Sequence, residues 1–276
     1  MNGIIILDKP KGPTSARVSL AVKQMLGTKT AHSGTLDPNV TGVLPVLVGN
    51  GIKLLEYLQE HDKTYVCLMQ TEKKIEEEKI KKAFSEFTGK IYQRPPEMSA
   101  VAKNIRTRNI YEIKILETKD NFVLFSVHCQ HGTYVRSLVD DVGKILGVKT
   151  KMLELRRTTS GPFKENESVS LTCLQDAVAL KNERPELLAS IIRPLEYAVK
   201  GFAKAEIRES AVKNVMNGAD VYKAGVKSIT GHVVAGTPVA LMSNERLIGV
   251  GVALHDKKTI DGMRSGAVIK TKKIIK

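Results

Sequence analysis

The chain has 276 residues, of which 42% are hydrophobic, and this size suits one large domain followed by a small one. It holds no apolar run of about 18 residues, which excludes a membrane-spanning helix, and its three widely separated cysteines indicate reduced thiols in a cytosolic protein. Its net charge of +14 favours a polyanionic partner, because each phosphate that Lys or Arg neutralises releases counterions.

The first predicted elements are a strand at residues 3–7 and a helix that begins at Thr14 or Ser15. The strand meets a charge at Asp8, too early for a signal peptide, and runs into a turn rich in Pro and Gly. The helix has apolar residues at helical spacing up to Gly27, which is a typical helix end.

A loop carboxylate follows in the stretch 31–49, where Asp37 stands directly before Pro38. A residue before proline is disfavoured in the helical region, so we expect Asp37 on a loop with an extended backbone. The apolar run 43–48 predicts a buried strand next to it. A carboxylate on a loop beside a rigid strand suits catalysis, whereas an Asp before Pro is also a common turn former. The residues alone leave both interpretations open.

The middle of the chain alternates helices and strands around one cationic segment. The predicted elements are a helix at 53–59, a strand at 63–69, a surface helix at 72–88, and strands at 110–116 and 122–128. Residues 93–100 are rich in Pro, and three cations follow at Lys103, Arg106 and Arg108. Such a segment is an exposed loop or a flap that closes over a phosphate backbone.

A second polar cluster precedes a helix predicted from Val135 to Leu146, whose apolar face includes Ile145. Arg136 lies in the first turn of this helix, where a cation is unfavourable for the helix dipole. We therefore expect a buried carboxylate to be its partner. Asp140 and Asp141 point to different faces and are interpreted as structural.

The remaining sequence changes character near its end. The predicted elements are a strand at 152–157, helices at 171–180 and 209–216, and short strands at 204–207, 233–236, 239–242, 248–254 and 268–270. Leu155, in the first of these strands, would by itself be interpreted as a core residue. Because short strands and Gly turns begin at Phe202, we predict two domains, 1–201 and 202–276.

Three motifs resemble those of the TruB class of pseudouridine synthases. The stretch 31–49 matches the pattern Gly-His-Ser/Thr-Gly-x-Leu-Asp-Pro, Thr-Gly and an apolar strand, with Ala31 in place of the usual Gly. Residues 7–15 match Leu-Asp-Lys-Pro-x-Gly-x-Thr-Ser, and residues 132–138 match Gly-Thr-Tyr-Ile/Val-Arg-Ser/Thr-Leu/Ile. The part from residue 202 onward resembles a PUA domain, a small β-barrel that binds RNA.

Details within the match resemble the archaeal and eukaryal dyskerin-type branch, notably residues 97–108 and the Arg-Arg-Thr-x-Ser-Gly-Pro-Phe turn. The resemblance implies an α+β fold, with a mixed or antiparallel sheet and flanking helices in the catalytic domain and a small β-barrel behind it. It implies isomerisation of uridine to pseudouridine in RNA with no cofactor and no metal. The implied partners are a guide RNA, a target rRNA or tRNA, and the small proteins of an H/ACA particle, in an archaeal-type cytoplasm or a eukaryotic nucleolus.

The resemblance also implies roles for single residues. Asp37 is the catalytic carboxylate, which begins cleavage of the glycosidic bond by covalent attack or by removing a sugar proton. Arg136 keeps Asp37 ionised and aimed, and Tyr65 stacks on the target uracil. The further substrate-binding residues are His32, which fills the space of the flipped base, Tyr134, Leu155, Lys9, Arg106 and Arg108. Lys9 has a second interpretation, in which it holds the neighbouring loop.

Two other functions stay open. A stand-alone enzyme acting on a tRNA stem-loop, as the bacterial branch does, would use the same active site. A non-catalytic RNA-binding or assembly protein would use only the PUA-like part, and the intact set of His32, Asp37, Tyr65 and Arg136 argues against it. Assays with and without guide RNA separate these functions.

Overall fold

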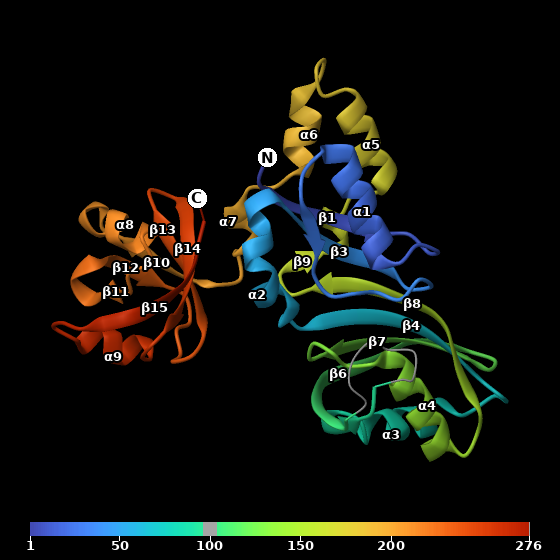
Figure 1. Cartoon of the computed structure of the whole chain (residues 1–276). Coiled ribbons are helices and arrows are strands. Elements are labelled where there is room, and N and C mark those ends of the chain that lie inside the picture. Colours follow the sequence, from blue (N-terminus) through green and yellow to red (C-terminus); the bar gives the residue numbers. More distant parts are fainter. Residues whose placement is uncertain (96–103, 276) are drawn as a thin grey trace.

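The computed structural model describes residues 1–95 and 104–275, and Figure 1 shows two units side by side. The strands of the first unit are β1 (Gly3–Lys9), β2 (Thr30–His32), β3 (Thr41–Val48), β4 (Lys63–Thr71), β5 (Gly89–Gln93), β6 (Arg106–Lys119), β7 (Phe122–Cys129), β8 (Thr150–Ser160) and β9 (Phe163–Lys164). They form one sheet in the order β1-β3-β8-β4-β7-β6-β5, with β2 beside β3 and β9 beside β8. The predicted α+β fold is confirmed.

The helices of this unit cover both faces of the sheet. They are α1 (Ser15–Leu26), η1 (Gly49–Leu54, a 3₁₀ helix), α2 (Leu55–Gln59), α3 (Glu77–Ser85), α4 (Val135–Leu146), η2 (Glu165–Glu167, also 3₁₀), α5 (Leu171–Ala179), α6 (Pro185–Ile191) and α7 (Leu195–Ala198). The side chain of Thr14 accepts from the backbone N–H of Arg17, and Gly27 ends α1 with φ of 63°, as predicted. Among the helices described, none is long and apolar enough to cross a membrane.

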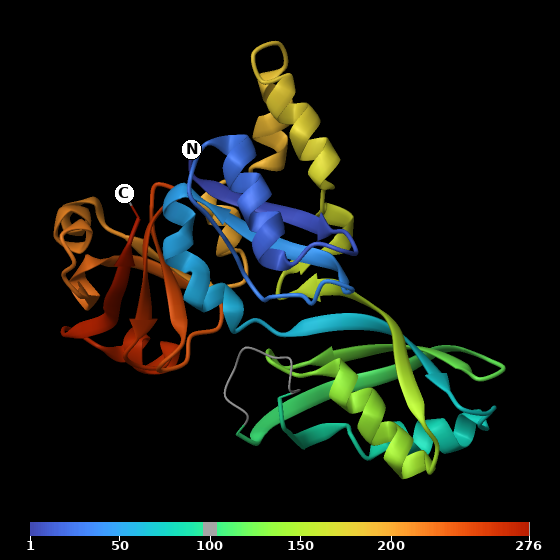
Figure 2. The same ribbon diagram turned by 45° about the vertical axis from the view of Figure 1, so that its right-hand side comes forward.

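Strands β1 and β3 form an antiparallel pair that is buried on both faces, with Ile5 opposite Val46. Helices α1, α5 and α6 pack on one face, while η1, α2, α7 and the second unit pack on the other. Figures 1 and 2 both show α5 and α6 projecting from this end of the molecule. Burial on both faces explains why the run at 43–48 is apolar without alternation.

The other end of the sheet carries α3 and α4 on one face, over a core that includes Phe125 and Leu138. Helix α4 ends at Gly147 with φ of 65°, as predicted. Ile145, however, is 51% exposed and does not belong to the buried face. It lies in the last turn of α4, next to Leu146, which does pack against this core.

The second unit is a smaller sheet rolled around its own apolar core, in the order β11-β15-β14-β13-β10-β12. Its elements are β10 (Ala203–Ile207), α8 (Glu209–Met216), β11 (Val221–Tyr222), η3 (Lys223–Gly225), β12 (Val226–Thr230), β13 (Pro238–Ser243), β14 (Arg246–Ala253), α9 (Lys257–Gly262) and β15 (Ala267–Ile274). The helix predicted at 209–216 is confirmed. The strand predicted at 233–236 is wrong, since these residues form a loop and a turn, and β12 takes its place in the sheet.

The two units share one hydrophobic cluster. Leu54 and Leu58, at 0% and 1% exposure, lie in it together with Met242 and Val250 of the second unit. Lys53 donates from Nζ to the backbone oxygen of Ile274 over 2.7 Å. Figure 2 shows the second unit against α2. The second unit is therefore docked on the first through apolar packing.

Candidate active site

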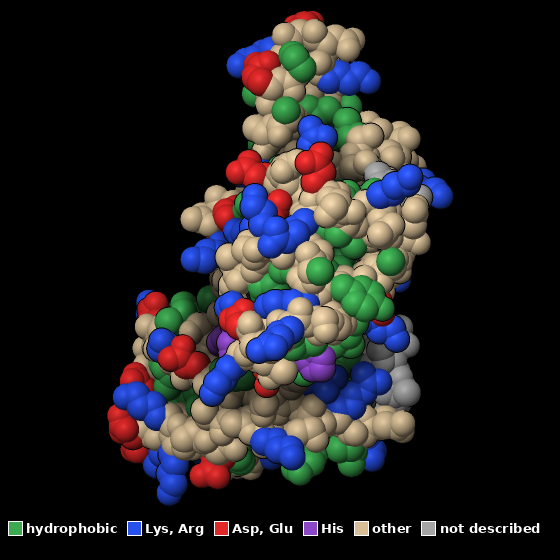
Figure 3. Space-filling model, turned by 90° about the vertical axis from the view of Figure 1, so that its left-hand side faces the viewer, with side chains coloured by type: hydrophobic (Ala, Val, Ile, Leu, Met, Phe, Trp, Pro, Cys, Tyr) green, Lys and Arg blue, Asp and Glu red, His purple; other side chains and the backbone are tan. Residues whose placement is uncertain are grey.

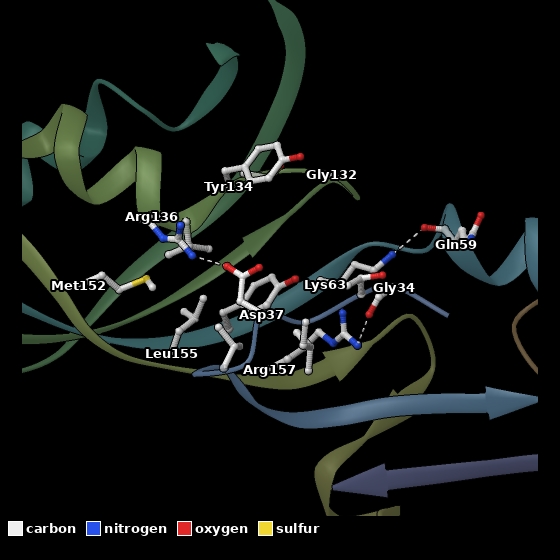
Figure 4. Close-up of a pocket in the computed structure, with 16 residues that line it drawn as sticks. Gly34, Asp37, Gln59, Lys63, Gly132, Tyr134, Arg136, Met152, Leu155 and Arg157 are labelled. Carbon is white, nitrogen blue, oxygen red and sulfur yellow. Dashed lines mark hydrogen bonds and ion pairs between the residues drawn. The ribbon is translucent and has the colours of Figure 1, made fainter. Parts of the chain in front are cut away.

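A cavity of about 230 Å³ lies where the loop before β3, strands β4 and β8 and the start of α4 meet (Figure 4). Strands β3 and β8 pair only briefly here, at Thr41 and Gly42, so the sheet opens beside the loop. Gly42 has φ of 103°, and a Cβ at this position would collide with the backbone oxygen of Arg157. The described residues that line the cavity are Gly34, Thr35, Leu36, Asp37, Val40, Gln59, Lys63, Tyr65, Gly132, Thr133, Tyr134, Val135, Arg136, Met152, Leu155 and Arg157.

Arg136 and Asp37 form the predicted ion pair at this cavity. Arg136 donates from Nη2 to Oδ2 of Asp37, and Figure 4 shows the two side chains pointing toward each other. The prediction that this carboxylate is buried is wrong, because the side chains of Arg136 and Asp37 are 40% and 57% exposed. Water thus reaches both charges from the open side of the cavity. The contact fixes the direction of the carboxylate more than it stabilises the fold.

Lys9 holds the Asp37 loop from inside. Its side chain is 0% exposed, and Nζ donates to the backbone oxygens of Pro10, Pro38 and Val40 over 2.9, 3.1 and 2.9 Å. A contact of Lys9 with substrate stays a prediction, and the side chain has no exposed surface in this structure. The alternative, a role in holding the loop, agrees with the structure. A buried ammonium needs such partners because burial disfavours its charge.

Arg157 is a central residue of the site that the sequence analysis missed. It is 1% exposed, and it donates from Nε to the Val43 oxygen over 2.7 Å and from Nη2 to the Gly34 oxygen over 2.8 Å. Burial raises the pKa of Tyr65, and the charge of Arg157 opposes this rise. One guanidinium therefore joins β3 to the Asp37 loop. Strand alternation could have found it, because Arg157 follows Leu155 by two residues on β8.

Lys63 is a second site residue that the sequence analysis missed. Strand alternation could have found it too, because it precedes Tyr65 by two residues on β4. It is 4% exposed, and its Nζ donates to the backbone oxygens of Gln59, over 2.8 Å, and of His61. Burial, and then the charge of Arg157, lower the pKa of Lys63 to about 8. A second cation is thus held at the cavity by carbonyl oxygens.

Tyr134 and Leu155 line the same cavity as Tyr65, on different elements. The backbone of Tyr134 is fixed by Gln93, whose amide donates to the Tyr134 oxygen over 3.0 Å and accepts from its N–H over 2.9 Å. Leu155 is 9% exposed and Met152 lies near it on β8. The structure therefore brings these predicted wall residues together around one space, with Met152 as an addition.

His32 lies close to the cavity on β2 but is not one of the described lining residues. Its Nε2 is 3.1 Å from Oγ1 of Thr35, which does line the cavity. The pKa of His32 is lowered, first by burial and then by the charge of Arg157. A neutral ring is thus favoured beside the loop that carries Asp37.

Arg106 and Arg108 were predicted on a loop, and this prediction is wrong. They lie in strand β6, where they pair with Gln93 and Ile91 of β5. Backbone pairing with β5, the edge strand of the sheet, places both arginines in a regular strand despite the cationic pattern. Residues 96–103, the rest of the predicted flap, lie outside the described part of the chain. The Arg108 guanidinium packs against Gly132, where a Cβ would come within 3.0 Å of Nε. In the described residues, no cluster of His, Cys, Asp and Glu could hold a metal ion.

Comparison with family models matches almost the whole chain. Residues 22–135 match the N-terminal domain of the TruB family of pseudouridylate synthases, and residues 136–200 match the C-terminal domain of tRNA pseudouridylate synthase B. Residues 203–275 match the PUA domain.

Curated relatives share this match over most of their own, greater length. A probable tRNA pseudouridine synthase B of Thermoplasma volcanium is 42% identical over 94% of this chain and 74% of its own length. One of Methanococcus aeolicus is 43% identical over 94% of this chain and 80% of its own.

Solved structures agree in fold. A structure of a Cbf5–Nop10–Gar1 complex has a TM-score of 0.93 at 39% identity, covering 99% of this chain and 84% of that one. A structure of an H/ACA RNP bound to a substrate RNA containing 2′-deoxyuridine has a TM-score of 0.92 at 37% identity, covering 99% and 85%. With the family models, these matches show that this chain belongs to the TruB family of pseudouridine synthases, isomerases that act on RNA, and carries a PUA domain.

Proposed function

We propose that this chain converts uridine to pseudouridine in RNA held by a guide RNA, with Asp37 as the group that starts the reaction. The observation that carries this proposal is the Arg136–Asp37 pair at the mouth of a cavity walled by Tyr65, Tyr134 and Leu155. The aromatic and aliphatic walls suit a uracil base that has flipped out of its stack. The carboxylate, oriented by a cation, lies beside this space, where it can reach the sugar of the flipped nucleotide.

The reaction breaks the bond between N1 of uracil and C1′ of ribose, turns the base and joins C5 to C1′. A proton leaves C5 and N1 gains one, so no oxidant or reductant is needed. Tyr65 and Leu155 hold the flipped base between them, Tyr134 closes the slot, and His32 fills the space that the base leaves. Asp37 acts on the sugar or the base by attack, or on a sugar proton as a base.

The guided assignment rests on similarity and charge. The structures at 39% and 37% identity are of a Cbf5–Nop10–Gar1 complex and of an H/ACA particle with substrate RNA. By analogy, this chain is a catalytic subunit that binds guide RNA, target RNA and small proteins of the Nop10 and Gar1 kinds in the cytoplasm. The net charge is +14, and Lys and Arg side chains gather across the middle of the face in Figure 3. Such a surface suits phosphate backbones.

A second candidate is a stand-alone tRNA enzyme. The curated relatives at 42% and 43% identity are named as probable tRNA pseudouridine synthases B. The same cavity would accept a uridine flipped from a tRNA loop. The division of labour between the units is also a proposal: residues 1–201 perform the chemistry and residues 202–276 bind RNA.

One assay separates the two candidates. RNA carrying tritium at C5 of uridine releases it to water when C5 bonds to the sugar. We expect fast release from an rRNA fragment only with its guide RNA and the two small partner proteins, and slow release from tRNA alone. Equal release from tRNA alone would show a stand-alone enzyme. The Asp37→Asn protein, in the same mixture, measures the background.

A further inference from the structure

Helix α2 and the preceding η1 contact the PUA domain directly. Leu54 and Leu58 are fully buried in the cluster that holds Met242 of β13. The exposed side chain of Lys53 donates to the backbone oxygen of Ile274 over 2.7 Å. These contacts tie the position of α2 to the docking of the PUA domain.

The other end of α2 reaches the active-site cavity. The backbone oxygen of Gln59, the last residue of α2, accepts the Nζ of Lys63 over 2.8 Å, and both residues line the cavity. Figure 4 shows this contact on the side of the cavity away from Arg136. Lys63 also lies against the Asp37 loop, because a Cβ on Gly34 would be 3.5 Å from its Cε. Tyr65 follows two residues later on the same strand.

Lys63 is poorly placed to bind RNA itself. It is 4% exposed, and its ammonium donates to the oxygens of Gln59 and His61. The charges that act on it are Arg157 from β8, which opposes its protonation, and Asp62 beside it, which favours it. A buried cation that donates to the backbone carbonyls of two residues holds that segment in place.

We propose that Lys63 is a positioning residue through which the docked PUA domain sets the geometry of the catalytic cavity. The path runs from Met242 through Leu58 and the end of α2 to Lys63, and from there to Tyr65 and the Asp37 loop. The PUA domain then contributes to the rate of isomerisation as well as to RNA affinity. This inference rests on the proposed function, because it takes the cavity to be the place of reaction.

Two neighbouring residues of β13 give a matched test. Met242 faces the cluster shared by the units, whereas Leu241 faces the PUA domain's own core. Met242→Ala and Leu241→Ala both remove a buried side chain, but only the first loosens the docking. Lys63→Met keeps the apolar stem and removes the ammonium. All variants are assayed in the full chain with partners and RNA, at a temperature where circular dichroism shows them folded.

We expect Met242→Ala and Lys63→Met each to lower kcat several-fold with KM nearly unchanged, and Leu241→Ala to leave kcat as in the parent. The double variant Met242→Ala with Lys63→Met should be no slower than Lys63→Met alone, because both act through one path. A Met242→Ala protein with parental kcat, or fully multiplied effects in the double variant, would overturn the inference. If Met242→Ala does not fold, Lys53→Ala loosens the same docking from an exposed position.

A second measurement does not depend on activity. Hydrogen exchange at the amides of residues 63–65 should speed up in Met242→Ala and stay unchanged in Leu241→Ala. Equal exchange in the two variants would refute the path. An inactive parent protein with the expected exchange difference would instead contradict the proposed function and leave the path supported.

Discussion

Arg136 and Asp37 meet where water reaches both side chains. An exposed ion pair adds only about 0–1 kcal/mol to stability, so folding gives little reason for a cation in the first turn of α4. Arg136 is better explained by its effect on the orientation of Asp37, because a guanidinium offers donors in a fixed planar arrangement that orients a carboxylate. The pair is thus best explained by chemistry at the cavity.

This account predicts that Arg136→Lys and Arg136→Gln both lower kcat, by on the order of 100-fold, because a misdirected reacting group loses most of its advantage. The Lys variant keeps the charge but not the geometry, so it should recover little. Tritium release under saturating RNA measures kcat, and thermal melting should show little change in either protein. Parental activity in Arg136→Lys would mean that charge alone matters.

His61 makes stability depend on pH. Burial, and then the charge of Lys63, lower the pKa of His61 from 6.5 to about 4. The unfolded chain therefore binds a proton more readily than the folded one in this window, so the free energy of unfolding falls as pH falls from 6.5 to 4. The loss at pH 5 relative to neutral pH is on the order of 2 kcal/mol.

His61→Gln should remove this part of the acid sensitivity. Urea unfolding at pH 5 and at pH 7.5, for parent and variant, measures the difference in unfolding free energy. The gap between the two pH values should be smaller in the variant. An equal gap in both proteins would show that His61 is not the titrating group.

At the scale of elements, a buried lysine holds the Asp37 loop in addition to the turn bond from the Val40 N–H to the Asp37 oxygen. Lys9→Met should remove the Lys9 donor from the oxygens of Pro38 and Val40, of which Pro38 keeps the N–H of Gly12, and lower the free energy of unfolding by about 1–3 kcal/mol. Activity should fall more than RNA affinity, because the loop carries Asp37. Lys11→Met, in the same turn but exposed, is the control. Equal loss in both variants would contradict the role of Lys9.

Sequence patterns predicted the elements that repeat apolar residues regularly, such as α1, α8 and the run in β3. They failed where pairing between distant strands determines the local structure. Arg106 and Arg108, for example, lie in a strand because they pair with β5. The sequence did not identify Lys63 and Arg157 as residues of the site, because charged side chains are expected on the surface. Backbone carbonyl oxygens of other segments accept hydrogen bonds from these two side chains and keep them buried. The motif around Asp37 was predictable because its spacing is local.

On the scale of the whole molecule, the two units are joined by a core that neither completes alone. Leu54, Leu58 and Leu195 pack with residues of β13 and β14 in this shared cluster. Their positions could not be predicted from sequence, because nothing local marks an apolar residue as belonging to an interface between units. Removal of one unit therefore affects the other.

A chain cut after residue 201 should melt at a lower temperature than the full chain and bind the dye ANS, because the shared cluster becomes exposed. Its remaining activity should be lower even at saturating RNA. Calorimetry and dye fluorescence measure the two effects. A truncated protein with parental melting temperature and no dye binding would show that the docking contributes no stability.

The central claim is that Asp37 starts the isomerisation, and Asp37→Asn tests it most directly. The substitution keeps the shape of the side chain and removes its charge, and the side chain is 57% exposed, so folding should be little affected. With guide, partners and C5-tritiated target RNA, we predict no tritium release above background while RNA affinity stays within about twofold of the parent. Turnover by the folded Asn variant at a rate near that of the parent would contradict the account.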